Sequence, residues 1–196
     1  MQMEDYPERE DGKKVWLRPE EVKELLGEIG DTERRIALGL MARSGLRSHE
    51  VVDVTADDVV DTPIDQTFVR VWAGKGSKYR ESPVPQSLAA TIRAYSDVRE
   101  ESSDEPLVDR PTRTLRRWVR AAADARREAT GDKGWSFLGP HDLRRTWGTL
   151  LVEAEVEPGL VMEFGGWDDW ETFREAYLGA YSLKAKKDGI GKVDWL

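Results

Sequence analysis

The sequence predicts a mainly helical domain with one small antiparallel β-hairpin or sheet, an α+β fold. Three observations support this fold class. Apolar residues repeat with a helical period along most of the chain, and helix-start residues such as Pro19 and Asp31 precede several of these segments. Only the stretch between Thr67 and Pro85 alternates with a period of two, as half-buried strands do. A length of 196 residues suits one compact domain with a sizeable core.

A polar segment, residues 1–18, precedes the first predicted helix. Pro19 stands at a favourable first helical position, and acidic residues follow it in the first turn, where the helix dipole favours negative charge. These signals predict a helix over residues 19–28. We expect disorder only toward the two ends of the chain.

A second helix is expected between Asp31, which can cap it, and Gly45, which can end it. The helix is apolar on most sides after Ile36, and this predicts a buried position at the centre of the domain. After a short break that carries Arg47, residues 48–54 resume a helical pattern.

The stretch with period two predicts a β-hairpin or a small sheet. Two extended runs, residues 67–72 and 79–84, flank a turn at 74–78 that has the sequence GKGSK. The glycines of this turn favour a tight reversal of the chain, so its lysines are expected at the tip of a hairpin.

The second half of the chain is predicted to be helical. The expected helices cover residues 87–98, 112–129, 141–156, 158–164 and 169–179. Asp168 can cap the last of them. The helix over 112–129 has one apolar face, and Arg116, Arg117 and Arg120 lie on the opposite face. These arginines either form a solvated face or contact phosphates.

Composition argues against several classes of chemistry. Cysteine is absent, so the chain has no disulfide, no thiolate nucleophile and none of the usual zinc frameworks. The only histidines are His49 and His141, which argues against a histidine-rich metal site, and we expect neither a metal nor a cofactor. No apolar run approaches the roughly 20 residues of a membrane span, and the first residues do not resemble a signal peptide. We therefore expect a cytoplasmic protein that does not enter a membrane.

The net charge of −8 argues at first sight against a nucleic-acid partner, because phosphate binding usually leaves a basic surface. However, arginine outnumbers lysine, and the acidic residues are spread through the helices instead of forming one tail. Such a composition resembles that of proteins from salt-loving archaea. In concentrated salt the Debye length falls to about 3 Å or less, so short-range contacts decide whether the surface binds DNA. The alternative is an acidic helical adaptor that binds proteins only.

Five short motifs follow one another along the chain. They are GLRSHE with Arg47, GKGSK with Lys75, HDLR with His141 and Arg144, GGW with Trp167, and finally Tyr177. Each motif alone is common by chance, but their order within matching predicted elements is more specific. The spacing of His141 and Arg144 puts both on one face of the first turn of a helix, where backbone N–H groups also favour an anion.

Together these motifs resemble the catalytic domain of the tyrosine recombinases, the phage integrase family, over about residues 19–182. The acidic composition resembles an archaeal member, haloarchaeal or from an archaeal virus. The resemblance implies the catalytic fold of DNA breaking–rejoining enzymes and a site-specific recombinase that acts on double-stranded DNA as a homo-oligomer, such as a tetramer. Residues 1–18 would be an N-terminal extension and residues 183–196 a tail, and the N-terminal core-binding domain that family members commonly carry would be absent.

The resemblance assigns catalytic roles to the arginines and the histidine. Attack on a phosphodiester adds negative charge to its oxygens, so catalysis needs fixed cations. Arg47 and Arg144 meet this need because a guanidinium can bridge two oxygens. His141 would assist deprotonation of the nucleophile or hydrogen-bond the phosphate. The structural alternatives are ion pairs of Arg47 with Glu50 and of Arg144 with Asp142, and a capping or core role for His141.

The resemblance also assigns Lys75 and Trp167. Lys75 matches the first lysine of the family motif and would protonate the departing 5′ oxygen, whereas Lys78 would contact a phosphate. Trp167 stands where the family has histidine or tryptophan, and its indole N–H could donate to the scissile phosphate. The alternatives are a solvated turn for the two lysines and a core position for the tryptophan.

Tyr177 is the expected nucleophile. Its hydroxyl needs assistance, because only about a thousandth of an unperturbed tyrosine is ionised at neutral pH. The interval from Trp167 to Tyr177 is one residue longer than the usual family spacing. One extra residue turns a helical side chain by about 100 degrees, so either the turn after Trp167 absorbs it or Tyr181 attacks instead.

The expected reaction joins the DNA 3′ phosphate to tyrosine and frees a 5′-hydroxyl. One phosphoester replaces another, so no ATP is needed, and the chain has no GxxxxGK[ST] motif for cradling nucleotide phosphates. The alternative is a non-catalytic DNA-binding accessory or regulatory protein with a recombinase fold.

Overall fold

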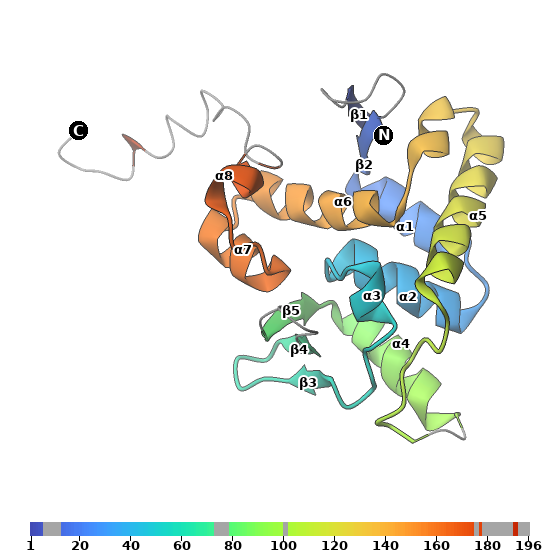
Figure 1. Cartoon of the computed structure of the whole chain (residues 1–196), viewed down its shortest axis with the longest axis vertical. Coiled ribbons are helices and arrows are strands. Elements are labelled where there is room, and N and C mark those ends of the chain that lie inside the picture. Colours follow the sequence, from blue (N-terminus) through green and yellow to red (C-terminus); the bar gives the residue numbers. More distant parts are fainter. Residues whose placement is uncertain (6–12, 73–78, 100–101, 175–176, 178–189, 192–196) are drawn as a thin grey trace.

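The computed structural model describes residues 1–5, 13–72, 79–99, 102–174, 177 and 190–191 (Figure 1). The helices are α1 (Pro19–Gly27), α2 (Thr32–Arg43), α3 (Ser48–Val51), α4 (Gln86–Asp97), α5 (Thr112–Thr130), α6 (Pro140–Glu153), α7 (Pro158–Gly165) and α8 (Trp170–Phe173), with a 3-10 helix at Lys133–Phe137. The strands are β1 (Gln2–Asp5), β2 (Lys13–Trp16), β3 (Val59–Asp61), β4 (Thr67–Val71) and β5 (Arg80–Val84). The predicted fold class, mainly α with a small antiparallel sheet, is confirmed.

Helix α2 forms the centre of the fold, as its apolar sequence predicts. Every residue from Ile36 to Ala42 is buried, and the helix packs against α4, α5 and α6 (Figure 1). The predicted cap is present, because the Asp31 side chain accepts a hydrogen bond of 2.8 Å from the backbone N–H of Arg34. Because neighbouring helices pack around α2, both ends of this helix have a defined position. The segment with Arg47 and α3 follows directly after its C-terminal end.

The predicted hairpin is the outer part of an antiparallel sheet with the order β3-β4-β5. Val71 pairs with Arg80, and Thr67 pairs with Val84. Alternate residues of β5 are buried, and the hydroxyl of Ser82 donates to the carbonyl of Ser44 at 2.6 Å, which ties the strand to the end of α2. Helix α7 packs beside β5 (Figure 1). Strand β3 was not predicted, because a run of three residues is too short to show a period.

The N-terminal segment differs from the expected polar extension. Strands β1 and β2 pair in an antiparallel register from Gln2 opposite Trp16 to Asp5 opposite Lys13. Val15 and Leu17 are fully buried. The backbone N–H of Leu17 donates to the hydroxyl of Thr146 in α6 at 3.0 Å. The end of this segment is therefore part of the core, since two apolar side chains in a polar stretch are enough to dock it.

One predicted cap is wrong by a residue. Helix α8 begins at Trp170, and its cap is Asp169, whose carboxylate accepts from the backbone N–H of Thr172 at 2.8 Å. Asp168, the predicted cap, lines a pocket instead. Either of two adjacent aspartates satisfies the sequence rule for a cap, and the path of the chain after α7 selects the second.

None of the helices that the structure describes combines the length and hydrophobicity that a bilayer crossing demands.

Candidate active site

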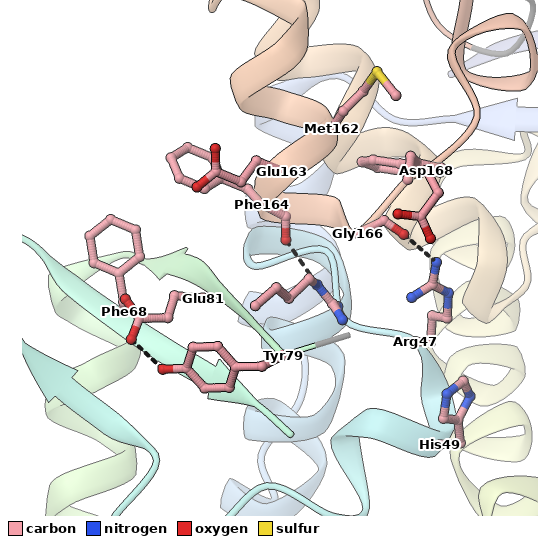
Figure 2. Close-up of a pocket in the computed structure, with 12 residues that line it drawn as sticks. Arg47, His49, Phe68, Tyr79, Glu81, Met162, Glu163, Phe164, Gly166 and Asp168 are labelled. Carbon is pink, nitrogen blue, oxygen red and sulfur yellow. Dashed lines mark hydrogen bonds between the residues drawn. The ribbon is translucent and has the colours of Figure 1, made fainter. Parts of the chain in front are cut away.

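A cavity of about 670 Å³ opens between α3, the β4-β5 strands and the end of α7. Arg47, His49 and Arg80 contribute basic side chains to its wall, and the turn that carries Gly166 and Trp167 closes it on the other side. Figure 2 shows Arg47 and His49 beside each other at one end of this pocket and Tyr79 and Glu81 at the other. The pocket lining therefore includes residues of two sequence motifs, GLRSHE and GGW.

Arg47 lies at the rim of the pocket as the N-cap residue of α3. Its guanidinium donates to the Glu50 carboxylate at 2.8 Å. It also donates to the backbone carbonyl of Gly166 at 3.2 Å (Figure 2). The side chain is 36% exposed, whereas that of Glu50 is 6% exposed. The ion pair between Arg47 and Glu50, the structural alternative for Arg47, is thus present. The guanidinium still remains partly exposed at the pocket, where it can bind a phosphate.

Arg144 is buried beneath the pocket, with 2% of its surface exposed. Its guanidinium donates to the carbonyl of Gly45 and, at 2.5 Å, to that of Gly165. It also lies 4.1 Å from the ring centre of Trp167. Burial, and then the charges of Arg47 and Arg80, lower the pKa of Arg144 to about 9, so it stays charged at neutral pH.

Asp142 does not pair with Arg144, in contrast to the structural alternative considered in the sequence. It forms an ion pair of 2.6 Å with Arg145 and accepts the backbone N–H of Gly139 at 3.0 Å, which caps the start of α6. The partners of Arg144 are backbone carbonyls instead. Arg144 thus makes no ion pair with Asp142, although the charge of Glu50 lies close enough to act on it.

Three arginines hold the C-terminal end of α7. The carbonyls of Phe164, Gly165 and Gly166 accept hydrogen bonds from Arg80, Arg144 and Arg47, respectively. The last carbonyls of a helix lack partners within it and carry partial negative charge, so cations are favourable at this position. This carbonyl cluster, residues 164–166, gathers the guanidinium groups without neutralising them.

Arg80, which lines the pocket, and Glu50, which binds Arg80, were not assigned to function from the sequence. Arg80 donates through both terminal nitrogens to Glu50, each at 2.7 Å. Burial alone would raise the pKa of Glu50, but the hydrogen bonds and charge of Arg80, and then those of Arg47, hold it at about 2. A signal was present: Arg80 occupies an inward-facing position of β5, where a charged residue requires a buried partner.

His141 begins the first turn of α6, as predicted. The residue is exposed, and nearby protein atoms still limit the contact of its imidazole with water. This partial burial, followed by the charges of Arg145, Arg144 and Arg47, lowers its pKa to about 4, so the imidazole is neutral at neutral pH. His141 also lines a second cavity of about 460 Å³ with His49, Arg113 and Arg116.

Tyr177 lies within an aromatic cluster next to these cations. Its ring centre is 5.0 Å from that of Phe173 and 5.0 Å from that of Trp167. Its ring also packs against Gly148 of α6, where an added Cβ would come within 2.8 Å. Burial raises the pKa of the Tyr177 hydroxyl, and the charges of Arg144 and then Arg145 and Arg47 act against that rise. The extra residue before Tyr177 therefore does not remove it from the cationic cluster.

Trp167 connects the nucleophile candidate with the buried arginine. It contacts Tyr177 at its edge, stacks on Trp147 at 6.0 Å and carries Arg144 over its ring. The predicted packing position beneath the pocket is present. Lys75, Lys78 and Tyr181 lie outside the described residues.

No group of three or more histidine, aspartate and glutamate side chains in the described part of the chain is placed to hold a metal ion. The cations that face the pocket are side chains of the protein, above all Arg47. Fixed guanidinium groups of this kind can stabilise negative charge that develops on a phosphate.

Residues 15–182 match the description "Phage integrase family". The chain belongs to the phage integrase family. Among curated relatives, this integrase-family chain is 32% identical to the tyrosine recombinase XerA of Thermococcus kodakarensis over 158 residues, which cover 80% of the chain and 55% of the relative. It is 32% identical to the tyrosine recombinase XerC of Corynebacterium glutamicum, over 69% of the chain and 43% of the relative. The archaeal relatives agree with the predicted archaeal type.

Solved structures share the fold of this integrase-family chain. A crystal structure of XerA recombinase matches 91% of the chain and 64% of its own length with a TM-score of 0.69 and 20% identity. The Tn1549 transposon integrase in complex with transposon right end DNA matches 95% of the chain and 68% of its own length with a TM-score of 0.73 and 15% identity. The integrase-family chain spans about half the length of the curated relatives it matches.

Proposed function

We propose that this chain carries the catalytic domain of a site-specific tyrosine recombinase, which cleaves and rejoins double-stranded DNA through a 3′-phosphotyrosine intermediate. One observation carries the proposal: Tyr177 packs beside Trp167, over which Arg144 lies, and the charges of Arg144, Arg145 and Arg47 act on its hydroxyl. Membership of the integrase family and relatives named tyrosine recombinases support the same activity.

The arginines would bind the scissile phosphate. Arg47 presents a partly exposed guanidinium, and Arg144 stays charged below it. As the tyrosine oxygen attacks, charge grows on the non-bridging oxygens, and preorganised donors stabilise this charge without reorganising. Two always-charged guanidinium groups would thus supply what a metal ion supplies in other phosphoryl-transfer enzymes.

Proton transfer would use a base and an acid on opposite sides of the phosphorus. The raised pKa of Tyr177 means that its proton must be removed during attack, and neutral His141 can accept it. The Tyr177 oxygen forms a bond to phosphorus, and the bond from phosphorus to the 5′ oxygen breaks. Lys75 would donate the proton that the 5′ oxygen takes up. A phosphoester is kept throughout, so no ATP or other cofactor is consumed.

The proposed organisation follows the sequence. Residues 19–182 would be the catalytic domain, with residues 1–18 before it and a tail from residue 183 onward. Relatives and neighbours include recombinases in complex with DNA, such as XerH bound to its difH substrate. We propose the same kind of partner here, double-stranded DNA, bound by a homo-oligomer in the cytoplasm, where that DNA lies.

Covalent trapping tests the proposed chemistry. A library of duplexes, each nicked close to a random candidate site, loses a short 5′-hydroxyl strand after cleavage and leaves the protein joined to DNA. We expect a protein–DNA adduct with the wild-type chain, no adduct with Tyr177→Phe and an unchanged adduct with Tyr181→Phe. Loss of the adduct in Tyr181→Phe alone would move the nucleophile to Tyr181.

Absence of any adduct across a range of salt concentrations, together with retained DNA binding, would favour the non-catalytic accessory protein. Absence of DNA binding at every salt concentration would favour the protein–protein adaptor.

The oligomer is tested separately by truncation after Tyr181. The apolar Val193, Trp195 and Leu196 lie in the removed tail, so truncation is expected to weaken assembly on DNA and to spare binding of a single site. Unchanged assembly would contradict a role of the tail.

A further inference from the structure

We propose that Arg80 is a positioning residue for DNA cleavage: it holds Glu50 and the end of α7 so that Arg47 and Arg144 stay directed at the scissile phosphate. Arg80 does not itself need to touch DNA for this role. The inference rests on the proposed recombinase function, and it adds a residue from β5 to the machinery of that site.

The contacts of Arg80 are those of a fixed clamp. Its side chain is 6% exposed and lies between α3 and α7. Its two terminal nitrogens donate to the two oxygens of Glu50 at 2.7 Å each, and Nε donates to the carbonyl of Phe164 at 3.0 Å. A planar guanidinium that uses three donors in this way has a single orientation, so Glu50 has one as well.

Glu50 in turn holds Arg47 in place through hydrogen bonds. The Glu50 carboxylate accepts the backbone N–H of Arg47 at 2.6 Å and its guanidinium at 2.8 Å. Both the start of α3 and the direction of the Arg47 side chain thus depend on where the carboxylate is held. Arg80 is the residue that binds both carboxylate oxygens through side-chain donors at once.

The same side chain supports the turn that leads to Trp167. Gly166 has a positive φ of 65°, and a Cβ added to it would lie 2.9 Å from Cδ of Arg80. The stem of Arg80 therefore packs directly on this turn. Arg80 donates to the carbonyl of Phe164, and the carbonyl of the next residue, Gly165, accepts from Arg144. Displacing Arg80 would loosen the carbonyl cluster that holds all three guanidinium groups.

The charge of Arg80 keeps Glu50 ionised in a buried position. Among the described residues, the charged groups that act on Glu50 are Arg47, Arg80 and Arg144. A small cavity beside it is also lined by Asp53, Asp58 and Arg70. Burial favours the protonated acid, and the acidic members of this set act in the same direction. Without Arg80, Glu50 would take up a proton at a higher pH and would hold Arg47 less firmly.

The test compares Arg80→Met with Arg80→Lys, and with Arg93→Met as a matched control. Arg93 forms an ion pair of 2.8 Å with Asp61 on the surface and does not line the pocket. Single-turnover cleavage of the nicked substrate is measured from pH 5.5 to 8, and binding is measured with Tyr177→Phe in each background so that no cleavage occurs.

We expect Arg80→Met to slow cleavage by about 10-fold at pH 8, because loss of a charge-assisted hydrogen bond costs about 10- to 100-fold in rate. At pH 5.5 we expect a loss of about 100-fold relative to wild type, because Glu50 is then also protonated. DNA affinity is expected to change by less than about threefold, because it is spread over many phosphate contacts. Arg80→Lys should restore much of the rate at pH 5.5, since it retains the charge. The added pH dependence should vanish when Glu50→Gln is combined with Arg80→Met.

A uniform loss of rate in Arg80→Met, equal at all pH values and not relieved by Arg80→Lys, would overturn the proposal and assign Arg80 a merely structural role. An unchanged rate would overturn it as well. Either result requires active wild-type protein, whereas an inactive wild type contradicts the proposed function itself, so the two failures are distinguishable.

Discussion

Glu50 is a buried carboxylate whose oxygens accept hydrogen bonds from two arginines. At the scale of single residues, the pocket depends on this one negative charge. The guanidinium groups of Arg47, Arg80 and Arg144 lie around it, and each of the three also donates to a carbonyl at the end of α7. Because the remaining partners are neutral carbonyls, the cluster keeps a positive charge for a phosphate to neutralise.

Acid should therefore destabilise the fold through Glu50. Its pKa is about 2, against an unperturbed value of 4.5. The folded-state pKa lies below the unfolded one, so the contribution is present above about pH 4.5 and is lost as the pH falls toward 2. At about 1.4 kcal/mol per pKa unit, this amounts to about 3 kcal/mol.

Urea unfolding at several pH values measures this contribution. In Glu50→Gln the part of the acid dependence between about pH 4.5 and 2 should disappear. Glu128, which is exposed on α5, provides the matched control Glu128→Gln. Equal acid dependence in both variants would contradict the assignment.

His141 should titrate unusually low in the free protein and higher on DNA. Partial burial and the charges of Arg145, Arg144 and Arg47 hold its pKa at about 4. A bound phosphate offsets those charges, and an opposite charge close by shifts a pKa by about 1–3 units, here upward. NMR titration of a His49→Gln, Tyr177→Phe variant follows His141 as the one remaining histidine. A midpoint that is the same with and without DNA would place His141 away from the phosphate.

At the scale of elements, the segment from α7 to α8 connects the cations with the nucleophile. Helix α7 ends on three arginines, a positive-φ turn at Gly166 follows, and α8 then directs Phe173 toward Tyr177, four residues later. Phe173 is fully buried. A helix of four residues has little stability of its own, so its cap and its packing must hold it.

Loss of the Asp169 cap should impair cleavage selectively. Asp169→Ala removes the acceptor of the Thr172 N–H and is expected to cost about 1 kcal/mol, mainly in α8. Asp31→Ala makes the same chemical change at the start of α2. Both variants should unfold at lower urea concentration, but only Asp169→Ala should slow adduct formation. Equal rates of adduct formation would show that α8 does not position Tyr177.

At the scale of the whole molecule, distant parts of the chain fix the first turn of α6. Strand β2 runs alongside this helix, where the N–H groups of Val15 and Leu17 bond to Asp142 and Thr146. The central helix α2 packs against the same helix. The position of His141 and Arg144 thus depends on residues more than a hundred positions away in the sequence.

Leu17→Ala should accordingly destabilise the whole domain. Leu17 is fully buried, and truncation of such a leucine typically costs about 2–5 kcal/mol. Ile64 is 70% exposed, so Ile64→Ala is the control and is expected to have almost no effect. Thermal and urea unfolding compare the two. A small loss in Leu17→Ala would indicate that the N-terminal segment docks only loosely.

The sequence by itself determined the fold class and the main elements, and it predicted which residues form the site. Helical and strand periods, with Pro19, Asp31 and Gly45 as boundaries, predicted α1, α2 and the β4-β5 pair, because local preferences and burial patterns are written along the chain. The order of the motifs identified Arg47, His141, Arg144, Trp167 and Tyr177 as members of one site. The structure brings these described residues together.

The tertiary structure alone decided how the site is supported. Buried polar groups choose partners by proximity in space, so the sequence could not show that Arg80 of β5 binds Glu50 of α3. It also left open which of two adjacent aspartates caps α8. These contacts join residues of different elements or depend on the path of the chain between them, and only packing fixes that path.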